Sequence, residues 1–348
     1  MIENDKMVKH IKNLYGNKQK HENEIKLIYK TKKSGKHKIF GYIFVVNNEN
    51  NIELIINGKK NKLVVEFDLE KGNNTIILII KNNLEDLGDM FRECVSLYNI
   101  DGLKYLNTKY CTNFRYMFRG CSSLSSIKPL EKWDMSKGIN LSYMFYGCLS
   151  LSDIKPLEKL DVSEFKDFCY MFYGCSSLSN IKPLENWNVS NGTDFTSMFF
   201  KCSSLSDLKP LEKWDVSKVT DFSDMFSFCE KLSDLKPLEK WNVSNGAYFK
   251  GMFSDCHSLT NIKSLEKWNV SNGVDFYGMF FKCSSLSDIK ALESWNVSNG
   301  TRFSYMFYEC SSLSNIKPLE NWNISKGRDF NDIFSECSSS LDITPLDK

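Results

Sequence analysis

The apolar residues of this chain recur at one fixed interval over most of its length. A Met-Phe dipeptide begins at Met90, Met117 and Met144 and recurs every 27 residues as far as Met306. A Cys stands four positions after each of these Met residues. Ile333-Phe334 followed by Cys337 makes a tenth copy. All seven Trp occupy one phase of the repeat and all seven Pro occupy another. Copies without insertions between these blocks predict a solenoid, in which stacked repeats bury one continuous core.

Each copy contains two short apolar patterns that predict different elements. The block Phe222–Cys229 places apolar side chains at i, i+3, i+4 and i+7, which is the spacing of one face of a helix. The segment Leu205–Lys209 has the short extended pattern of a strand, which Pro210 would end because proline cannot donate to a sheet ladder. Stacking the copies would place these strands side by side in a parallel sheet. The pattern therefore predicts an α/β repeat solenoid, with a parallel sheet on one side and short helices on the other.

The N-terminal part of the chain does not follow the repeat. It contains five strand-length apolar pieces, at 24–31, 37–46, 51–57, 63–69 and 75–81. Asn57-Gly58 is a favourable hairpin turn between two of them. Because repeat arrays need caps that hide their terminal apolar face, we expect a small antiparallel, β-rich N-terminal cap. The chain then divides into a basic N-terminal segment (1–23), the cap (24–83) and a solenoid of about ten 27-residue repeats (84–348).

Composition narrows the classes of function. The formal net charge is +2, whereas a dedicated nucleic-acid binder usually has a strongly basic domain, so we expect no nucleic-acid partner. Residues 1–40 hold eleven Lys against four acidic residues, which favours a solvated tail and leaves an acidic partner or a membrane surface as the alternative. No apolar window is long enough for a membrane span, and no signal peptide is recognisable. A cytoplasmic protein is expected, with the cell surface or secretion by an unrecognised route as the alternative.

The repeated Cys and Trp could carry chemistry or form the core. The Cys lie one full repeat apart without any C-x-x-C pair, and none of the four His shares their phase, so burial is expected rather than metal binding. Leu106 and Leu160 replace Trp without loss of phase. This favours indoles packed between copies over an exposed aromatic strip that binds sugar. Cys111 and Cys169 stand outside the repeat pattern, and the sequence assigns them no role.

A charged column is the candidate partner-binding face. A Lys recurs in eight copies, usually with an Asp or Asn two residues before it and always with a Glu three residues after it. In a parallel sheet the stacked Lys would repel one another, and the neighbouring acids would offset that repulsion. The alternative is a solvated ladder that keeps the array soluble. The candidate residues are Asp153, Lys155, Glu158, Lys182, Glu185, Asp207, Lys209, Glu212, Asp234, Lys236, Glu239, Lys263, Glu266, Asp288, Lys290, Glu293, Lys317 and Glu320.

Two further patterns bear on function. Nine Asn-x-Ser/Thr sequons occur, but Asp134, Asp161 and Asp215 fill the same phase as Asn188. That position is therefore interpreted as a turn residue rather than a glycan acceptor. The sequence has no Gly-rich phosphate loop, no G-x-S-x-G and no H-E-x-x-H motif. We expect no catalytic residues, no cofactor, no metal and no enzymatic activity.

The repeat combines L-x-x-I-x-P, W-[ND]-x-S and M-F-x-x-C-x-x-L over about residues 84–348. It resembles the BspA-like leucine-rich repeats, in particular their Mycoplasma-lipoprotein-type branch. It departs from that pattern in carrying K-P-L-E where a short L-D-L-S segment is common. The resemblance implies a non-catalytic leucine-rich-repeat solenoid used for binding, in a family with many surface proteins and adhesins.

The pattern and the resemblance together predict a non-enzymatic scaffold that binds protein partners of unknown identity through the repeated sheet face. One alternative is a surface adhesin that binds host proteins or glycans. A second is a self-assembling structural protein that stacks through its weakly capped C-terminal end.

Overall fold

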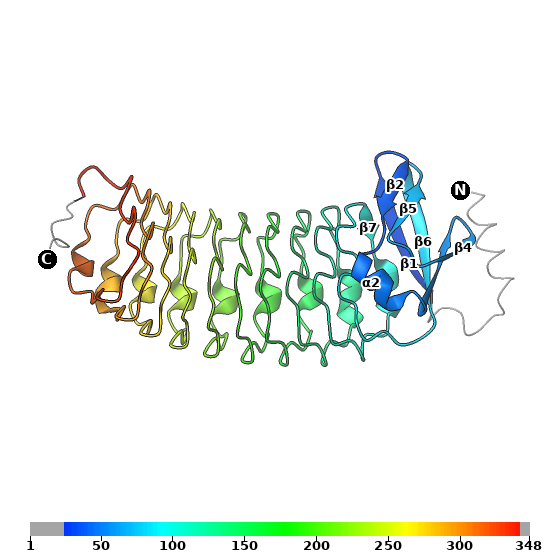
Figure 1. The fold of residues 1–348 in the computed structure, drawn as a ribbon, viewed down its shortest axis with the longest axis horizontal. Helices are drawn as coiled ribbons and strands as arrows, with labels where there is room; N and C mark the ends of the chain where they lie inside the picture. Colours follow the sequence, from blue (N-terminus) through cyan, green and yellow to red (C-terminus); the bar gives the residue numbers. More distant parts are fainter. Residues whose placement is uncertain (1–23, 342–348) are drawn as a thin grey trace.

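The computed structural model describes residues 24–341, which form a β-rich unit followed by a long array of repeats (Figure 1). The β-rich unit lies at one end of the array, and successive copies follow one another along the long axis as the colours pass from cyan to red. The predicted basic segment 1–23 lies outside the described residues. Tandem repetition therefore organises the fold, as the sequence period predicts.

The β-rich unit is built on an antiparallel sheet with the strand order β4-β3-β6-β1-β7 and a second, two-stranded sheet β2-β5. Asn57 and Gly58, with φ of 52° and 75°, form the turn between β3 and β4, as the Asn-Gly signal predicts. The strands are β1 (Glu24–Thr31), β2 (Gly35–Lys38), β3 (Ile52–Ile56), β4 (Lys59–Lys62), β5 (Glu66–Leu69), β6 (Gly72–Ile80) and β7 (Leu97–Asn99).

The apolar piece 37–46 does not form the predicted strand, because Tyr42–Asn48 form the short helix α2. Phe40 and Phe44 pack with their ring centroids 6.0 Å apart, and Phe40 also lies 5.7 Å from Phe91 of the first repeat. Tyr42, between the two, is 66% exposed. A helix that begins here carries Phe44 back toward Phe40, whereas a strand would bury alternate residues.

The β-rich unit covers the open end of the first repeat. The Gly41 amide donates to the Met90 carbonyl at 3.0 Å, beside the contact of Phe40 with Phe91. A Cβ atom on Gly41 would lie 1.9 Å from the Asp89 carbonyl oxygen, so only glycine allows this approach. β1 also pairs with β7, which belongs to the first copy. The unit therefore occupies the place of an N-terminal cap.

The array itself is built from turns, 3-10 helices and single-residue parallel bridges between copies. Beyond β7, the described residues contain no strand and no α-helix. A 3-10 helix lies over the segment that usually reads Lys-Pro-Leu, and these helices form the row of short coils in Figure 1. Proline suits the first turn, where its missing amide hydrogen is not needed. The helices are η1 (Asp101–Tyr105), η2 (Lys128–Lys132), η3 (Lys155–Leu157), η4 (Lys182–Leu184), η5 (Lys209–Leu211), η6 (Lys236–Leu238), η7 (Lys263–Leu265), η8 (Lys290–Ser294) and η9 (Lys317–Leu319).

The block predicted as a helix, Phe222–Cys229, instead forms successive turns that pair with the next copy. Asp224 and Phe228 have positive φ, 56° and 58°. A helix would use the amides of the block within the copy, and the copies would lose the hydrogen bonds that join them. The predicted helix is therefore wrong. Every second amide donates to a carbonyl of the next copy, at 2.7–3.0 Å: Phe222 to Tyr248, Asp224 to Lys250, Phe226 to Met252 and Phe228 to Ser254.

The segment predicted as a strand, Leu205–Lys209, is not one either. The 3-10 helix η5 begins at Lys209, whose amide donates to Asp207 Oδ1 at 2.8 Å. At this phase the described copies are joined by single-residue parallel bridges at only two steps. The Asp side chain satisfies an amide that a strand ladder would otherwise pair. Within residues 24–341, the continuous parallel sheet predicted for the array is therefore absent.

The core runs along the whole array as stacked columns. Phe199 and Phe226 stack with centroids 5.8 Å apart and 3° between their planes. The same contact recurs at every step from Phe91 to Phe334. The Met, Leu and Cys columns lie buried alongside it. Each apolar face is thus covered by the next copy, which is why single copies are not stable units.

Candidate functional site

The Cys column is buried and bonds to the preceding copy. The Sγ atom of Cys229 lies 3.4 Å from the Phe199 carbonyl oxygen, and the equivalent contact recurs from Cys121 to Cys337. Burial raises the pKa of the Cys229 thiol well above its usual range. The expected burial is confirmed. A buried, protonated thiol is a poor nucleophile and a poor metal ligand.

The Trp column packs between copies. Trp241 is 4% exposed, and its Nε1 donates to the Leu211 carbonyl of the preceding copy at 2.9 Å. Its ring centroid lies 6.3 Å from that of Phe222. Trp322, in the last copy, is only partly buried. Packing is therefore confirmed for this column, and the exposed aromatic strip is wrong.

The predicted partner-binding face lies on the 3-10 helices, and all eight Lys of the column are exposed. We call this row of Lys and Glu residues the Lys–Glu row. Lys209 pairs with Glu212, and Lys236 pairs with Glu239. The pKa of Glu212 lies below its ordinary value, first because of its hydrogen bond with Lys209. Both signs of charge thus alternate along an exposed surface, where an ion pair contributes little to stability.

The Asp residues of this face accept hydrogen bonds from the backbone. Asp153 Oδ1 accepts the Lys155 amide at 2.9 Å, and Asp207, Asp234 and Asp288 act in the same way in later copies. These bonds fix the start of each 3-10 helix. The structure therefore brings the predicted residues together as one row, but it uses their Asp side chains to shape the backbone.

The Asn-Val-Ser phase is a turn, as interpreted from the sequence. Asn188 Oδ1 accepts the Ser190 amide at 3.2 Å, and Asp134 Oδ1 accepts the Ser136 amide at 3.1 Å. Asn and Asp are interchangeable in this role because each offers one short-armed acceptor oxygen.

A second row of side chains comes from the variable positions of the Phe-x-x-Met-Phe-x-x-Cys block. Two lines of rings each cross three successive copies, with centroids 4.3–4.6 Å apart. The Tyr116 and Tyr143 rings are tilted by 42°, and the other neighbouring pairs are stacked. We call the two lines the aromatic ladder: Tyr116, Tyr143 and Tyr170 in one, and Tyr146, Tyr173 and Phe200 in the other.

Arginine side chains cover the N-terminal end of the aromatic ladder. The Arg115 guanidinium lies 4.5 Å from the Tyr116 ring centroid, and that of Arg119 lies 4.9 Å from Tyr146. Burial raises the pKa of Tyr173 to about 12. The signal that could have revealed this row is the variation between copies at the positions flanking the constant Phe, Met, Phe and Cys.

Cys111 and Cys169, the two cysteines outside the repeat pattern, contact polar groups close to them. Cys111 is buried and lies 3.0 Å from the Leu84 carbonyl oxygen. Within residues 24–341, Asp167, Cys169 and Asp194 form the one group with three potential metal-ligand atoms within 4.8 Å of one another. Burial, and then the hydrogen bond with Asp167, raises the pKa of the Cys169 thiol, and burial raises the pKa of Asp194. The Cys169 amide also donates to Asp167 Oδ1 at 3.0 Å, so this group is joined by local hydrogen bonds.

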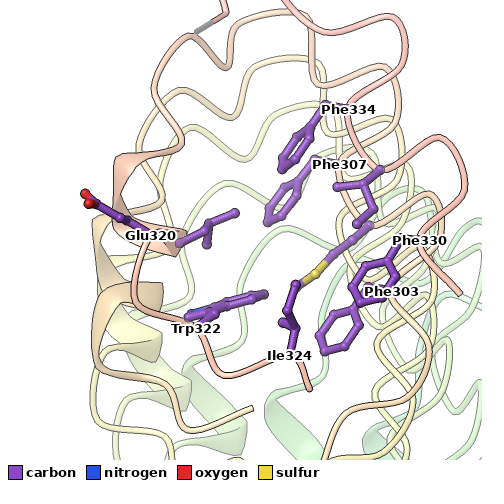
Figure 2. A pocket seen from close by; sticks show the side chains of 10 residues that line it. Phe303, Phe307, Glu320, Trp322, Ile324, Phe330 and Phe334 are labelled. Carbon is purple, nitrogen blue, oxygen red and sulfur yellow. The ribbon is translucent and has the colours of Figure 1, made fainter. Parts of the chain in front are cut away.

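The last described copy leaves an apolar cavity of about 160 Å³ at the C-terminal end of the array (Figure 2). In Figure 2 the Phe303 and Phe330 rings form one stack and the Phe307 and Phe334 rings another, while the Glu320 carboxylate points away. The lining residues are Phe303, Met306, Phe307, Leu319, Glu320, Trp322, Ile324, Phe330, Ile333 and Phe334.

Four overlapping segments, residues 67–181, 150–264, 177–288 and 234–344, match the family described as "Mycoplasma protein of unknown function, DUF285". Together they run from residue 67 to residue 344, well over half of the chain. The chain belongs to this family. The DUF285 matches begin within β5 and continue through the array, so the family pattern includes the end of the β-rich unit. Neither a curated protein nor a solved structure matches the chain.

Across the part of this DUF285 protein that the structure describes, no helix has the length and apolar character needed to cross a membrane.

Proposed function

We propose that this DUF285 protein is a non-enzymatic scaffold that binds protein partners along the side of its repeat array. The observation that supports the proposal is the division between buried and exposed columns. The Cys and Trp columns are used in contacts between copies, whereas the Lys–Glu row and the aromatic ladder remain at the surface. Enzyme sites usually gather a few unlike groups in one concavity. Here the Lys and Glu groups recur on exposed surface from copy to copy, and the aromatic ladder is partly exposed across a few copies.

The Lys–Glu row and the aromatic ladder would contribute differently to the binding of a partner. The Lys–Glu row is nearly constant between copies, so a partner could bind it in several registers, mainly through charge. The aromatic ladder is confined to a few copies and combines Tyr with Arg, two residue types enriched at the energetic centres of interfaces. We assign partner specificity to the aromatic ladder and charge-dependent association to the Lys–Glu row.

We also propose that the array is a variant of the BspA-like leucine-rich repeat. The supporting features are the shared repeat pattern and the parallel bridges that join successive copies, such as Asp167 with Asp194. A surface adhesin is the second candidate that this relation suggests. The ring faces of the aromatic ladder lie against one another, which leaves few of them free for a sugar and favours a protein partner over a glycan.

Two surface variants test the scaffold function. One changes Tyr143→Ser, Tyr170→Ser and Tyr173→Ser, a change that the fold tolerates elsewhere because Ser197 and Ser227 occupy the same two phases. The other changes Lys182→Gln, Lys209→Gln and Lys236→Gln. Proteins retained from an extract of the native cells are then quantified on the unchanged protein and on both variants.

We expect at least one partner that the Tyr variant loses and the Lys variant retains at low salt. If both variants retain the same proteins as the unchanged chain, neither row binds partners and the proposal fails. Matching circular dichroism spectra and unfolding midpoints of the three proteins provide the folding control.

A further inference from the structure

The antiparallel sheet of the β-rich unit is apolar on both of its faces. Ile76 and Leu78 of β6 point to the inner face and are 0% exposed. Ile77 and Ile79 alternate with them and point to the outer face, because successive residues of a strand point in opposite directions. Both are only half-buried, and neither is among the apolar residues that pack on the core of residues 24–341. A strand that is apolar on both faces is typical of a sheet that is covered on both sides.

Pairing between the strands brings further Ile residues to the outer face. Ile77 lies opposite Ile55 of β3 on one side and opposite Lys26 of β1 on the other. Directly opposed residues share a face, with Cβ atoms about 5 Å apart. Ile28 and Ile79 lie two residues after Lys26 and Ile77, so they point the same way. We call these four half-buried residues the Ile strip: Ile28, Ile55, Ile77 and Ile79.

Lysine side chains border the Ile strip on two sides. Lys60 and Lys62 of β4 lie on the far side of β3, opposite Ile55 and its neighbour on the same face. Lys26 and Lys30 of β1 border the strip on the other side, and all four Lys are exposed. Because a Lys side chain is longer than an Ile side chain, the strip forms the floor of a groove between two rows of positive charge.

The charge of the outer face selects among the possible occupants. Its acidic residues include Glu24 and Glu53, and the Glu53 carboxylate already lies 2.9 Å from Lys81 Nζ. Two such faces placed together would bring Lys rows against Lys rows, which argues against a second copy of this chain. Residues 1–23, which lie outside the described residues, hold five Lys against three acidic residues, so their charge has the same unfavourable sign.

The shape of the groove argues against a lipid surface. A flat bilayer would meet the Lys side chains before it reached the Ile strip. An amphipathic helix is narrow enough to lie between the two Lys rows, and a helix on a sheet is a common packed layer. Acidic residues on both flanks of its apolar stripe would complement the lysines.

We propose that the outer face of this sheet is a docking site for an amphipathic helix of a partner protein, with an apolar stripe flanked by Asp and Glu. The stripe would cover the Ile strip, and the carboxylates would pair with the lysines of β1 and β4. Apolar burial supplies affinity, and the charges on the two flanks orient the helix and exclude basic helices. This site lies on the β-rich unit, so it is independent of the Lys–Glu row and the aromatic ladder.

A synthetic amphipathic helix is the probe. The labelled peptide has about 14 residues, with Leu along one face and Glu at the flanking positions, and its control has Lys at the flanking positions. Binding to the full chain is followed by fluorescence anisotropy. We expect saturable binding of one Glu peptide per chain and no binding of the Lys peptide.

Two double variants should each weaken binding of the Glu peptide about tenfold or more. One is Ile77→Thr with Ile79→Thr, which keeps β-branched residues in the strand. The other is Lys26→Gln with Lys60→Gln. The matched control removes three exposed Lys of the repeat array and should retain binding: Lys159→Gln, Lys231→Gln and Lys240→Gln. Equal unfolding midpoints of the variants provide the folding control.

Four results would overturn the proposal. The first is no binding of the Glu peptide, or equal binding of the Lys peptide. The second is an equal loss of binding in the array variant, which would mean general charge attraction. The third is binding that occurs only after deletion of residues 1–23, which would make that segment the occupant. The fourth is sedimentation with vesicles of phosphatidylglycerol and phosphatidylcholine that the Ile variant abolishes, which would make a lipid surface the occupant.

Discussion

The two ends of the repeat array are covered in different ways. At the N-terminal end, the β-rich unit places Phe40 on Phe91 and directs the Gly41 amide at the Met90 carbonyl. At the C-terminal end, Phe330 is 38% exposed, and the amide row of the tenth copy has no acceptor within residues 24–341. Within the Phe-x-x-Met-Phe block the backbone amides donate to the next copy, whereas the Thr220 and Ala247 amides and the Trp241 indole donate to the preceding copy. The two ends of the array therefore differ in the hydrogen-bonding groups that the block presents.

The largest expected effect contrasts the middle of the array with its C-terminal end. Phe226 is buried between two stacked rings, so Phe226→Ala should lower the free energy of unfolding by about 3–5 kcal/mol. Phe330→Ala should cost clearly less, because only one ring covers it. Urea unfolding of both variants measures the difference. Equal losses would mean that Phe330 is covered on both faces in solution.

The next effect tests the N-terminal end. A Cβ atom on Gly41 would lie 1.9 Å from the Asp89 carbonyl oxygen, so Gly41→Ala should separate the cap from the first copy and cost about 1–3 kcal/mol. The exposed neighbour Tyr42→Ala is the control and should change stability by less than about 0.5 kcal/mol. The same urea experiment measures both. If Gly41→Ala left stability unchanged, the contact of the cap with the Met90–Phe91 end would not be a stabilising one.

A smaller effect is expected from the indole hydrogen bonds. Trp241→Phe keeps a large ring but removes one of the two donors to the buried Leu211 carbonyl, which still accepts the Trp214 amide at 3.1 Å, so the loss should be about 0.5–1.5 kcal/mol. Trp322 makes the equivalent bond to Leu292 at 2.8 Å, but it is only partly buried, so water can replace the lost donor and Trp322→Phe should cost less. Thermal unfolding of the two variants ranks them. The reverse order would contradict a well-covered middle and an open C-terminal end.

The pKa values of two Cys thiols allow the two ends of the array to be compared. Burial raises the pKa of Cys94, under the cap, far above its usual range, but raises that of Cys337, in the last copy, only to about 11. Cys337 should therefore react first with a thiol reagent as the pH rises, and mass spectrometry of the labelled peptides would show it. In the unfolded chain thiols ionise near pH 8.5, so the free energy of unfolding should fall as the pH rises above about that value. Labelling of Cys94 before Cys337 would contradict this comparison.

The repeat period predicts the tandem architecture and the buried Cys and Trp columns correctly, because buried positions are occupied by apolar residue types that the sequence shows directly. It fails for Phe222–Cys229, since the i, i+3, i+4, i+7 spacing fits a helix and a run of turns equally well. Hydrogen bonds between copies decide between them, and they do not show in the apolar pattern. The Lys column is found at the surface as predicted, but on 3-10 helices rather than strands, because Asp207 and its equivalents bond to the Lys amides.

The aromatic ladder shows a different limit of the sequence. Tyr116, Tyr143 and Tyr170 lie one repeat apart, so their alignment is visible in the chain once the repeat is known. Their partial exposure follows from the successive turns of the block, which the apolar spacing does not reveal.

Amide hydrogen exchange resolved by residue tests the pairing of each Phe-x-x-Met-Phe block with the next copy most directly. The account predicts slow exchange for the amides of Phe222, Asp224 and Phe226, which donate to the next copy, and fast exchange for those of Phe330, Asp332 and Phe334 at the open end. Equal protection of both groups in the free chain, or fast exchange at Phe222 and Asp224, would contradict the account.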